Sequence, residues 1–150
     1  MANTKQFCTF YLDGHFFGVP VNEVQEVIRY QEMTRVPLVS EVVRGLINLR
    51  GQIVTAIDLR RRLGMKDRPA EQLPMNVVIR TGDGAVSLLV DEIGDVLEAD
   101  EESLEAPPAT LHGTARELIR GVHKLQDRLL LGLNTEQAVN VDETTGQQRS

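Results

Sequence analysis

Residues 44–54 read Arg-Gly-Leu-Ile-Asn-Leu-Arg-Gly-Gln-Ile-Val, and the chain repeats this pattern at residues 120–130, which read Arg-Gly-Val-His-Lys-Leu-Gln-Asp-Arg-Leu-Leu. A second match precedes each copy, because residues 21–28 (Val-Asn-Glu-Val-Gln-Glu-Val-Ile) align with residues 90–97 (Val-Asp-Glu-Ile-Gly-Asp-Val-Leu). Two copies are too few for a solenoid, so the repeat predicts a duplicated small barrel whose halves meet at about residues 70–85. A seam between two such halves is a natural place for a binding groove. The alternative is a chance similarity between two β-rich sequences.

The size and composition of the chain allow one folded domain with a hydrophobic core. The chain has 150 residues, of which 41% are hydrophobic and 25% charged, and domains of about 100 to 150 residues are the commonest. Its formal net charge of -6 has the wrong sign for a protein that neutralises nucleic-acid phosphates. Cys8 is the only cysteine, so the chain cannot form an internal disulfide. Without a signal peptide or a long apolar run, we expect a cytoplasmic protein that does not insert into the membrane.

Short strands dominate the expected secondary structure. Apolar runs rich in β-branched residues, separated by turns that contain Gly, Asn or Asp, are typical of an all-β barrel or sandwich. We expect strands at residues 7–12, 15–19, 26–30, 46–48, 52–57, 75–80, 85–90, 95–97, 118–125 and 128–133. The expected helical segments, at residues 21–25, 59–63 and 135–139, are too short for the crossover helix of a parallel α/β sheet. The polar residues 140–150 are expected to form a mobile tail.

No arrangement in the sequence points to catalysis or to a bound cofactor. His15, His112 and His123 have no ligand partners at the spacing of a zinc site. The glycine-rich residues 81–85 lack the Lys-Ser or Lys-Thr of a phosphate-binding loop. The paired carboxylates of residues 91–92 are interpreted as surface groups. We therefore expect no catalytic residues, no metal and no cofactor.

The turn at residues 48–51 is the best candidate for a binding feature. Gly51 can adopt a positive φ without steric cost, and the side chain of Asn48 can close the turn. Arg50 would then project from a tight turn with its five donors free for a carboxylate of a partner. The alternative is a structural turn that happens to contain an arginine.

Residues 43–63 resemble the signature of the CheW family, the coupling proteins of bacterial chemotaxis. The family element Gly-Val-Ile-Asn-Leu-Arg-Gly is similar to residues 45–51 (Gly-Leu-Ile-Asn-Leu-Arg-Gly), which are followed by an apolar strand and by Asp-Leu-Arg at residues 58–60. One departure is Thr55, which replaces the proline usual in that strand. The resemblance covers about residues 7–139, with further landmarks in family order at residues 17–21, 24–28, 36–37, 89–91, 95–97 and 127–129.

The resemblance implies an all-β fold with short helices, in which two intertwined five-stranded barrels of the Src-homology-3 type form one CheW-like domain over residues 1–139. It implies a protein without catalytic activity that couples transmembrane chemoreceptors to the histidine kinase CheA in arrays at the inner face of the membrane. The partners would be the cytoplasmic tips of methyl-accepting chemoreceptors and the regulatory domain of CheA. The residues that match the family's receptor-binding positions are Val24, Glu26, Asn48, Leu49, Arg50, Gly51 and Val96. Those that match its kinase-binding positions are Val42, Val43, Arg44 and Gly45.

Three other functions stay open at this point. A CheW-like coupler can serve a chemosensory pathway that controls pili or gene expression. A small β-barrel can also use its groove for a metabolite, although the sequence lacks convergent titratable residues. Nucleic acid is the least favoured ligand, because the net charge is negative and the base-rich half of the chain has no aromatic residues.

Overall fold

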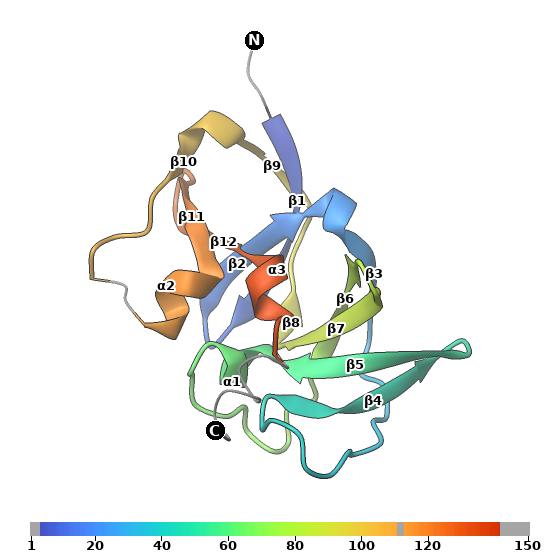
Figure 1. The fold of residues 1–150 in the computed structure, drawn as a ribbon. Coiled ribbons are helices and arrows are strands. Elements are labelled where there is room, and N and C mark those ends of the chain that lie inside the picture. The colour runs from blue at the N-terminus through green and yellow to red at the C-terminus, as the bar shows by residue number, and fades with distance from the viewer. Residues whose placement is uncertain (1–3, 111–112, 142–150) are drawn as a thin grey trace.

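The computed structural model describes residues 4–110 and 113–141, and this part of the chain is built mainly from strands (Figure 1). The strands are β1 (Thr4–Leu12), β2 (His15–Pro20), β3 (Val24–Ile28), β4 (Val43–Leu49), β5 (Gln52–Asp58), β6 (Met75–Thr81), β7 (Gly84–Val90), β8 (Glu92–Ile93), β9 (Leu97–Asp100), β10 (Leu104–Glu105), β11 (Ile119–Lys124) and β12 (Leu129–Leu133). The helical turns are η1 (Val21–Glu23), α1 (Leu59–Arg62), η2 (Glu101–Ser103), α2 (Thr114–Leu118) and α3 (Thr135–Ala138).

One sheet has five strands in the order β3-β6-β7-β5-β4. The hairpins β4–β5 and β6–β7 are antiparallel, and β5 joins β7 in parallel. The chain that leaves β3 crosses to β4 at the opposite edge, where Thr34 and Leu46 exchange two backbone hydrogen bonds of 2.9 and 2.8 Å. This bridge closes the sheet into a small barrel, which we call the first barrel.

The second sheet repeats this topology with other strands. Its order is β10-β11-β12-β2-β1-β8, and β9 also pairs with β1. The hairpins β11–β12 and β1–β2 are antiparallel, and β12 joins β2 in parallel. The chain that leaves β9 passes through η2 into β10, which pairs with β11 and so closes the second barrel. The repeated stretches 44–54 and 120–130 therefore occupy equivalent hairpins, β4–β5 and β11–β12.

The predicted fold class, two intertwined β-barrels with short helices, is confirmed, with one difference in strand number. The second sheet has seven strands rather than five. Two of them, β8 and β9, are separate pieces along β1, and β10 is a two-residue strand at the edge.

The glycine shared by the two repeats has the same structural task in both barrels. A Cβ atom on Gly45 would lie 2.6 Å from the carbonyl oxygen of Thr34, and a Cβ atom on Gly121 would lie 2.6 Å from that of Glu105. The strand register also shifts at this glycine in both hairpins. The closing segment of each barrel can therefore approach the hairpin only where no side chain is present.

Three hydrophobic clusters hold the molecule together: one inside each barrel and a larger one in the seam between the barrels. The hairpins β1–β2 and β6–β7 contribute to two clusters each, because their two faces are both buried. On β6, for example, Val78 packs inside the first barrel while Val77 and Ile79 pack in the seam. Burial on both faces explains why these strands read as continuous apolar runs.

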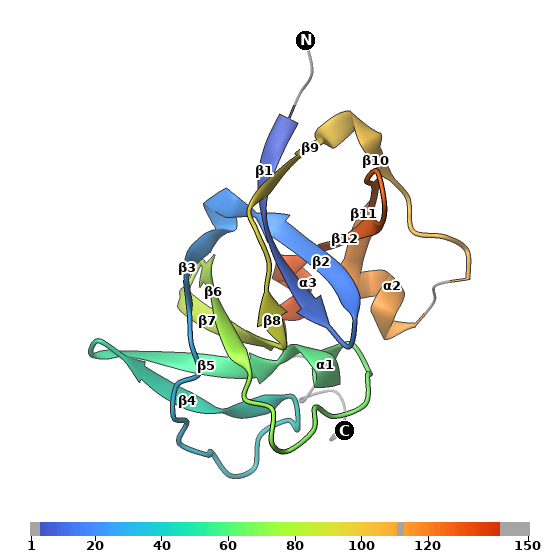
Figure 2. The same cartoon turned by 180° about the vertical axis from the view of Figure 1, so that it is seen from behind.

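Hairpin β1–β2 belongs to the second barrel, although it comes before the strands of the first barrel in the chain. The first barrel uses residues 24–90, whereas the second combines β1–β2 with strands after residue 91; Figure 2 shows the blue hairpin beside the orange and red strands of the chain's other end. The seam where the sequence suggested a groove contains the largest of the three hydrophobic clusters. An open cleft of about 830 Å³ lies at one end, between the β6–β7 turn and α3. The repeat boundary at residues 70–85 stays a prediction.

Several local predictions differ from the structure. The strand expected at residues 26–30 is β3, which runs from Val24 to Ile28. The strand expected at residues 95–97 runs from Leu97 to Asp100. Between the β8 and β9 pairings, the three residues 94–96 lie opposite only two residues of β1, 8 and 9, which interrupts the strand as a bulge does. Helix α2 was not expected, although its sequence Thr-Ala-Arg-Glu-Leu contains good helix formers. The strand predicted to start at residue 118 starts at Ile119, directly after this helix.

The predicted tail begins at Asn140, and two of its residues belong to the described part of the chain. Val141 is only 5% exposed and packs in the seam. Packing therefore continues at least to this residue, and the remainder of the predicted tail, residues 142–150, lies outside the described residues.

Candidate functional site

The turn between β4 and β5, which contains Arg50, lies at the outer end of the first barrel (Figure 1). Arg50 and Gly51 both have positive φ, 52° and 89°, as a two-residue type I′ hairpin turn requires. Leu49 and Gln52 pair at its base. The Gly51 amide donates a 2.9 Å hydrogen bond to Asn48 Oδ1. The asparagine side chain therefore holds the turn as predicted, and glycine supplies one of its two left-handed positions.

Arg50 is held by a partner within the chain. Its guanidinium donates to the carboxylate of Glu26 on β3 and forms an ion pair with it. The prediction that all its donors are free was therefore wrong. The side chain of Arg50 is nevertheless 67% exposed, against 23% for that of Glu26. Because an exposed ion pair contributes only about 0 to 1 kcal/mol, a carboxylate of a partner can replace Glu26 at small cost.

The strands next to this ion pair also carry exposed apolar side chains. Ile53 is 63% exposed and lies opposite Asn48 in the β4–β5 ladder. Val27, the residue after Glu26 on β3, is 37% exposed. A charged pair with apolar neighbours is a suitable docking surface for a protein helix, because apolar contacts supply affinity while the charges fix register. We call Glu26, Val27, Asn48, Arg50, Gly51 and Ile53 the turn surface.

Three of the predicted receptor-binding residues lie elsewhere. Val24 is 9% exposed and packs in the seam, and Leu49 is 6% exposed and packs inside the first barrel. These two side chains support the turn surface from within. Val96 is 56% exposed, but it lies between β8 and β9 on the second sheet. Figure 2 shows that this segment runs along β1 near the centre of the molecule, whereas the β4–β5 turn projects outward.

The predicted kinase-binding residues 42–45 lie at the opposite end of the β4–β5 hairpin. The Val42 carbonyl accepts a 2.7 Å hydrogen bond from the Asp58 amide. The Val43 amide donates to the Ser40 carbonyl. Arg44 Nη1 lies 3.3 Å from Asp58 Oδ2. The structure therefore brings these residues together, and Asp58 anchors two of them.

Residues 35–42, which we call the strap, lead into this end of the hairpin. Leu38 at its tip is 99% exposed and has a φ of 63°, a conformation that costs a non-glycine residue about 1 kcal/mol or more. Val39 beside it is 42% exposed. The strap, Val43, Arg44 and Arg61 line a cleft of about 500 Å³. An exposed leucine beside a cleft forms a second candidate protein-binding surface.

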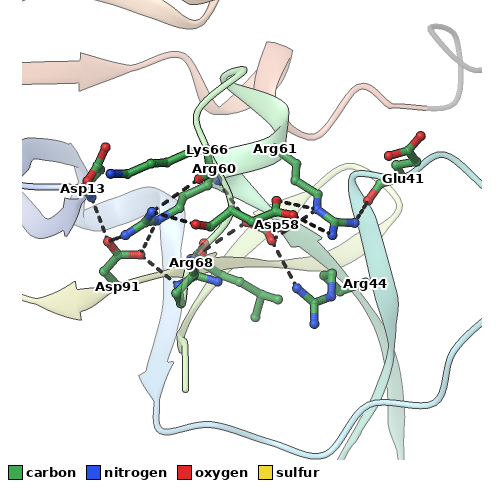
Figure 3. Close-up of polar contacts among 11 residues, drawn as sticks. Asp13, Glu41, Arg44, Asp58, Arg60, Arg61, Lys66, Arg68 and Asp91 are labelled. Carbon is green, nitrogen blue, oxygen red and sulfur yellow. Dashed lines mark hydrogen bonds and ion pairs between the residues drawn. The ribbon is translucent and has the colours of Figure 1, made fainter. Parts of the chain in front are cut away.

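A buried cluster of two arginines and two aspartates lies beside α1 (Figure 3). Arg60 donates from Nε and Nη2 to the two oxygens of Asp91, at 3.0 and 2.5 Å. Arg68 Nε donates to Asp91 at 2.9 Å, and Arg68 Nη2 lies 3.8 Å from Asp58. All four side chains are less than 10% exposed. We call them the arginine–aspartate cluster.

The burial of Asp91 in this cluster contradicts one prediction from the sequence. Asp91 was interpreted as a surface carboxylate, yet it is 8% exposed. The available signal was its place directly after the buried run at residues 88–90, where a carboxylate at the end of a doubly buried strand needs a cationic partner. The spacing of Arg60 and Arg68 in the sequence gave no indication that both would reach it.

The electrostatics of the cluster favour its ionised form. Burial by itself would raise the pKa of Asp91, but hydrogen bonds from Arg60, from the Asp13 amide and from Arg68 outweigh burial and hold this pKa below its ordinary value. The hydrogen bond to Asp91 raises the pKa of Arg60, against the opposing effect of burial. Both groups therefore stay charged at neutral pH, and they act as a structural ion pair.

Two further observations concern the described residues as a whole. Residues 4–110 and 113–141 contain no group of three His, Cys, Asp or Glu side chains placed to hold a metal ion. None of the helices in these ranges has the length and apolar character needed to cross a membrane.

Comparisons with known proteins agree on one family. The model of the CheW-like domain matches residues 6–143. The chain is 28% identical to the chemotaxis protein CheW of Klebsiella aerogenes over 139 residues, which cover 93% of this chain and 84% of the relative. It is 30% identical to CheW of Bacillus subtilis over 126 residues, 84% of this chain and 81% of the relative.

A solved structure and a second type of relative extend these matches. The crystal structure of the scaffolding protein TtCheW from Thermoanaerobacter tengcongensis superimposes with a TM-score of 0.83 at 27% identity, over 95% of both chains. Protein PilI of Pseudomonas aeruginosa is 32% identical over 124 residues, which cover 81% of this chain and 68% of PilI.

Proposed function

This chain belongs to the CheW family of chemotaxis scaffold proteins, and from this premise we propose that it couples transmembrane chemoreceptors to the histidine kinase CheA in receptor arrays. One observation carries the proposal. The turn surface and the strap lie at opposite ends of the same hairpin, β4–β5, whose strands have seven residues each. Such strands are roughly 20 Å long. A single rigid element thus separates two exposed surfaces far enough for two partners to bind at once.

We propose the turn surface as the contact for the cytoplasmic tip of a receptor. An α-helical hairpin can place apolar side chains against Ile53 and Val27, while a carboxylate of the receptor competes with Glu26 for Arg50. Asn48 and Gly51 hold the turn, and Val24 and Leu49 support it from the core. Val96 is proposed as a separate contact on the second barrel, on the exposed segment between β8 and β9.

We propose the strap end of the hairpin as the contact for the regulatory domain of CheA. Val42, Val43, Arg44 and Gly45 form the entry to β4 there, and they are expected to act with the exposed Leu38. The described contacts leave the apolar tip of the strap without packing, so burial against a partner would remove Leu38 from water.

We propose an adaptor role without catalysis, cofactor or metal, and a cytoplasmic location at the inner face of the membrane, to which receptor arrays recruit the protein. This proposal rests on the family, whose structural relative is described as a scaffolding protein. Nucleic acid and direct membrane insertion have no part in it.

Reconstitution tests the function. Receptors in vesicles and purified CheA from the same genome are combined with and without this protein, and kinase autophosphorylation is measured as receptor ligand is added. We expect receptor control of the kinase only when the protein is present. Arg50→Ala should abolish this control, whereas Arg128→Ala, at the equivalent turn of the second barrel, should not. Kinase activity that never responds to the protein, with both partners folded, would contradict the proposal.

A second candidate function is supported by the similarity to PilI. A coupler of a pathway that controls pili would use the same two surfaces with a different receptor and kinase. Repeating the reconstitution with each receptor and kinase pair of the genome separates the two functions, because only the cognate pair should respond.

A further inference from the structure

Three consecutive arginines of α1 reach three different parts of the molecule. Arg60 points inward to Asp91. Arg61 Nη1 donates a 2.9 Å hydrogen bond to the carbonyl oxygen of Glu41 in the strap. Arg62 donates to the carbonyl oxygens of Gln137 and Ala138 in α3, at 2.7 and 3.2 Å. A one-turn helix at the end of β5 is thus joined to the strap, to the barrel junction and to the last helix.

We propose that α1 and the arginine–aspartate cluster position the strap relative to the second barrel, and so set the geometry of the surface that receives the kinase. This inference rests on the proposed function, because it names the residues that orient one of its two surfaces. Figure 3 shows the continuous set of contacts between Asp13 on one side and Glu41 on the other.

Two polar contacts join α1 and the arginine–aspartate cluster to the second barrel. The amide of Asp13, in the turn between β1 and β2, donates a 2.7 Å hydrogen bond to Asp91 Oδ2. Arg62 holds α3, which follows β12. Between these contacts, Leu59 is fully buried and Leu63 is 7% exposed in the seam. Helix α1 is therefore packed against the second barrel by apolar contacts and bonded to it by charged groups.

The strap side depends on Asp58 and Arg61. Asp58 is 1% exposed, and it accepts from the Arg60 amide as the N-cap of α1. The same carboxylate faces Arg44, and the Asp58 amide donates to Val42. Arg61 adds its bond to Glu41. The start of α1 and the end of the strap are thus held by the same residues.

The chemistry of the cluster suits positioning. An arginine fork bound to both oxygens of a carboxylate fixes distance and angle together. Buried ion pairs contribute little net stability because desolvation opposes their attraction, so a role in fixing one arrangement is the better explanation for four buried charges. Arg60 also donates to the carbonyl oxygens of Lys66 and Asp67 at 3.3 and 3.4 Å, so the segment between α1 and β6 is held at the same point.

Hydrogen exchange and binding measurements on the full chain test this inference. Asp91→Asn weakens the cluster without touching the strap, and Arg61→Gln removes the direct bond to Glu41. Arg128→Gln serves as the matched control, because Arg128 donates to Tyr11 and stacks on Phe16, away from α1. Amide exchange is followed by peptide in the strap and in β11–β12, and the affinities for the CheA regulatory domain and for a receptor fragment are measured by calorimetry.

We expect both variants to raise strap exchange and to weaken binding of the kinase domain about tenfold, the effect of one charge-assisted hydrogen bond. In both variants, exchange in β11–β12 and the receptor affinity should stay at wild-type levels. In Arg128→Gln, strap exchange and both affinities should do so. Wild-type exchange in the strap of folded Arg61→Gln and Asp91→Asn would overturn the inference, as would exchange that rises equally throughout the chain. If Asp91→Asn does not fold, Arg61→Gln alone decides, since its side chain is 33% exposed. If the wild type binds neither partner, the proposed function fails, while strap exchange still tests the positioning.

Discussion

Arg50 combines a strained backbone with an exposed charge. Its φ of 52° would suit glycine or asparagine better, and such strain is found most often where function requires it. The ion pair with Glu26 is too exposed to contribute the stability that would offset this backbone strain. The residue is therefore better explained by what it offers to a partner than by what it does for the fold.

Replacing Arg50 tests this explanation at the scale of one side chain. Arg50→Ala should lower receptor affinity and leave the melting temperature nearly unchanged. Arg50→Gly should weaken binding as much, yet stabilise the fold by about 0.5 to 1 kcal/mol because glycine relieves the left-handed strain. Thermal melts and calorimetric titrations provide both quantities. Loss of the folded state in Arg50→Ala would show that the arginine is structural.

Val24 and Val96 form a matched pair for a second test. Val24 is buried in the seam, so Val24→Ala should lower the free energy of unfolding by about 1 to 3 kcal/mol. Val96 is mostly exposed, so Val96→Ala should cost less than about 0.5 kcal/mol and reduce receptor affinity instead. Urea unfolding and binding measurements separate the two effects. Equal losses of stability would mean that Val96 packs against the core in solution.

At the residue scale, the sequence predicted the turn but not its ion pair. The positive φ of Gly51 and the role of Asn48 follow from local turn chemistry. The contact of Arg50 with Glu26 joins residues 24 positions apart, and the pairing of Asp91 with Arg60 joins residues 31 apart. Such contacts depend on how the barrel closes, which local patterns do not specify.

At the scale of the elements, each barrel closes at one of the two repeated hairpins, β4–β5 and β11–β12. In each, a glycine lets a passing segment approach the strand backbone to a distance that a methyl group would block. The repeat in sequence is thus explained by the same steric requirement in both halves. This explanation does not depend on any assumption about the partners.

Alanine substitutions test the closures. Gly45→Ala and Gly121→Ala should each destabilise the protein by about 2 kcal/mol or more, because the added Cβ meets a backbone carbonyl that cannot move without breaking the closure. Gly82→Ala is the control, since a Cβ there has nothing within 4 Å. Chemical denaturation of the three variants gives the comparison. A change below about 0.5 kcal/mol at Gly45, within the range of neutral surface substitutions, would contradict the steric account.

Element prediction succeeded where periodicity and turn residues agree, and failed where tertiary contacts intervene. The β6–β7 hairpin was predicted almost to the residue, and so was β2, but β1 begins three residues before its predicted start. The break between β8 and β9 arises where three residues, 94–96, lie opposite two residues of β1, and α2 is a five-residue helix that was not predicted. The register against a strand more than eighty positions away leaves no trace in the local pattern.

At the scale of the whole molecule, the two barrels are joined by exchanged hairpins and a common apolar seam. Hairpin β1–β2 belongs to the second barrel although it precedes the first in the chain, and β7 leads directly into β8 of the second barrel. The barrels should therefore unfold together rather than separately. The charged cluster lies at the edge of this seam. Protonation of Asp91 in acid should therefore lower the free energy of global unfolding of the two barrels.

The stability of the protein should fall in acid in two stages. Burial lowers the pKa of His123, and Arg120 adds to this effect. The unfolded chain therefore takes up this proton first, and the free energy of unfolding should decrease as the pH drops below about 6.5 until the folded histidine titrates. Asp91, whose pKa is also lowered, should add a second loss below about pH 4.

Melting temperatures measured from pH 8 to pH 3 check this sequence of events. His123→Gln should remove the first stage, because glutamine does not titrate, and leave the second in place. His15→Gln, at an exposed histidine, is the control and should leave both stages unchanged. A wild-type melting temperature that stays constant between pH 7 and pH 5 would contradict the assigned burial of the His123 ring.

The account's central claim is that this chain holds a receptor and a kinase at the two ends of one hairpin. The most direct test is calorimetric titration of the protein with the CheA regulatory domain, repeated after saturation with a receptor cytoplasmic fragment, both from the same genome. The account predicts saturable binding of each partner and a kinase affinity that the bound receptor does not abolish. Mutually exclusive binding would contradict two separate surfaces, and binding of neither folded partner would contradict the coupling function itself.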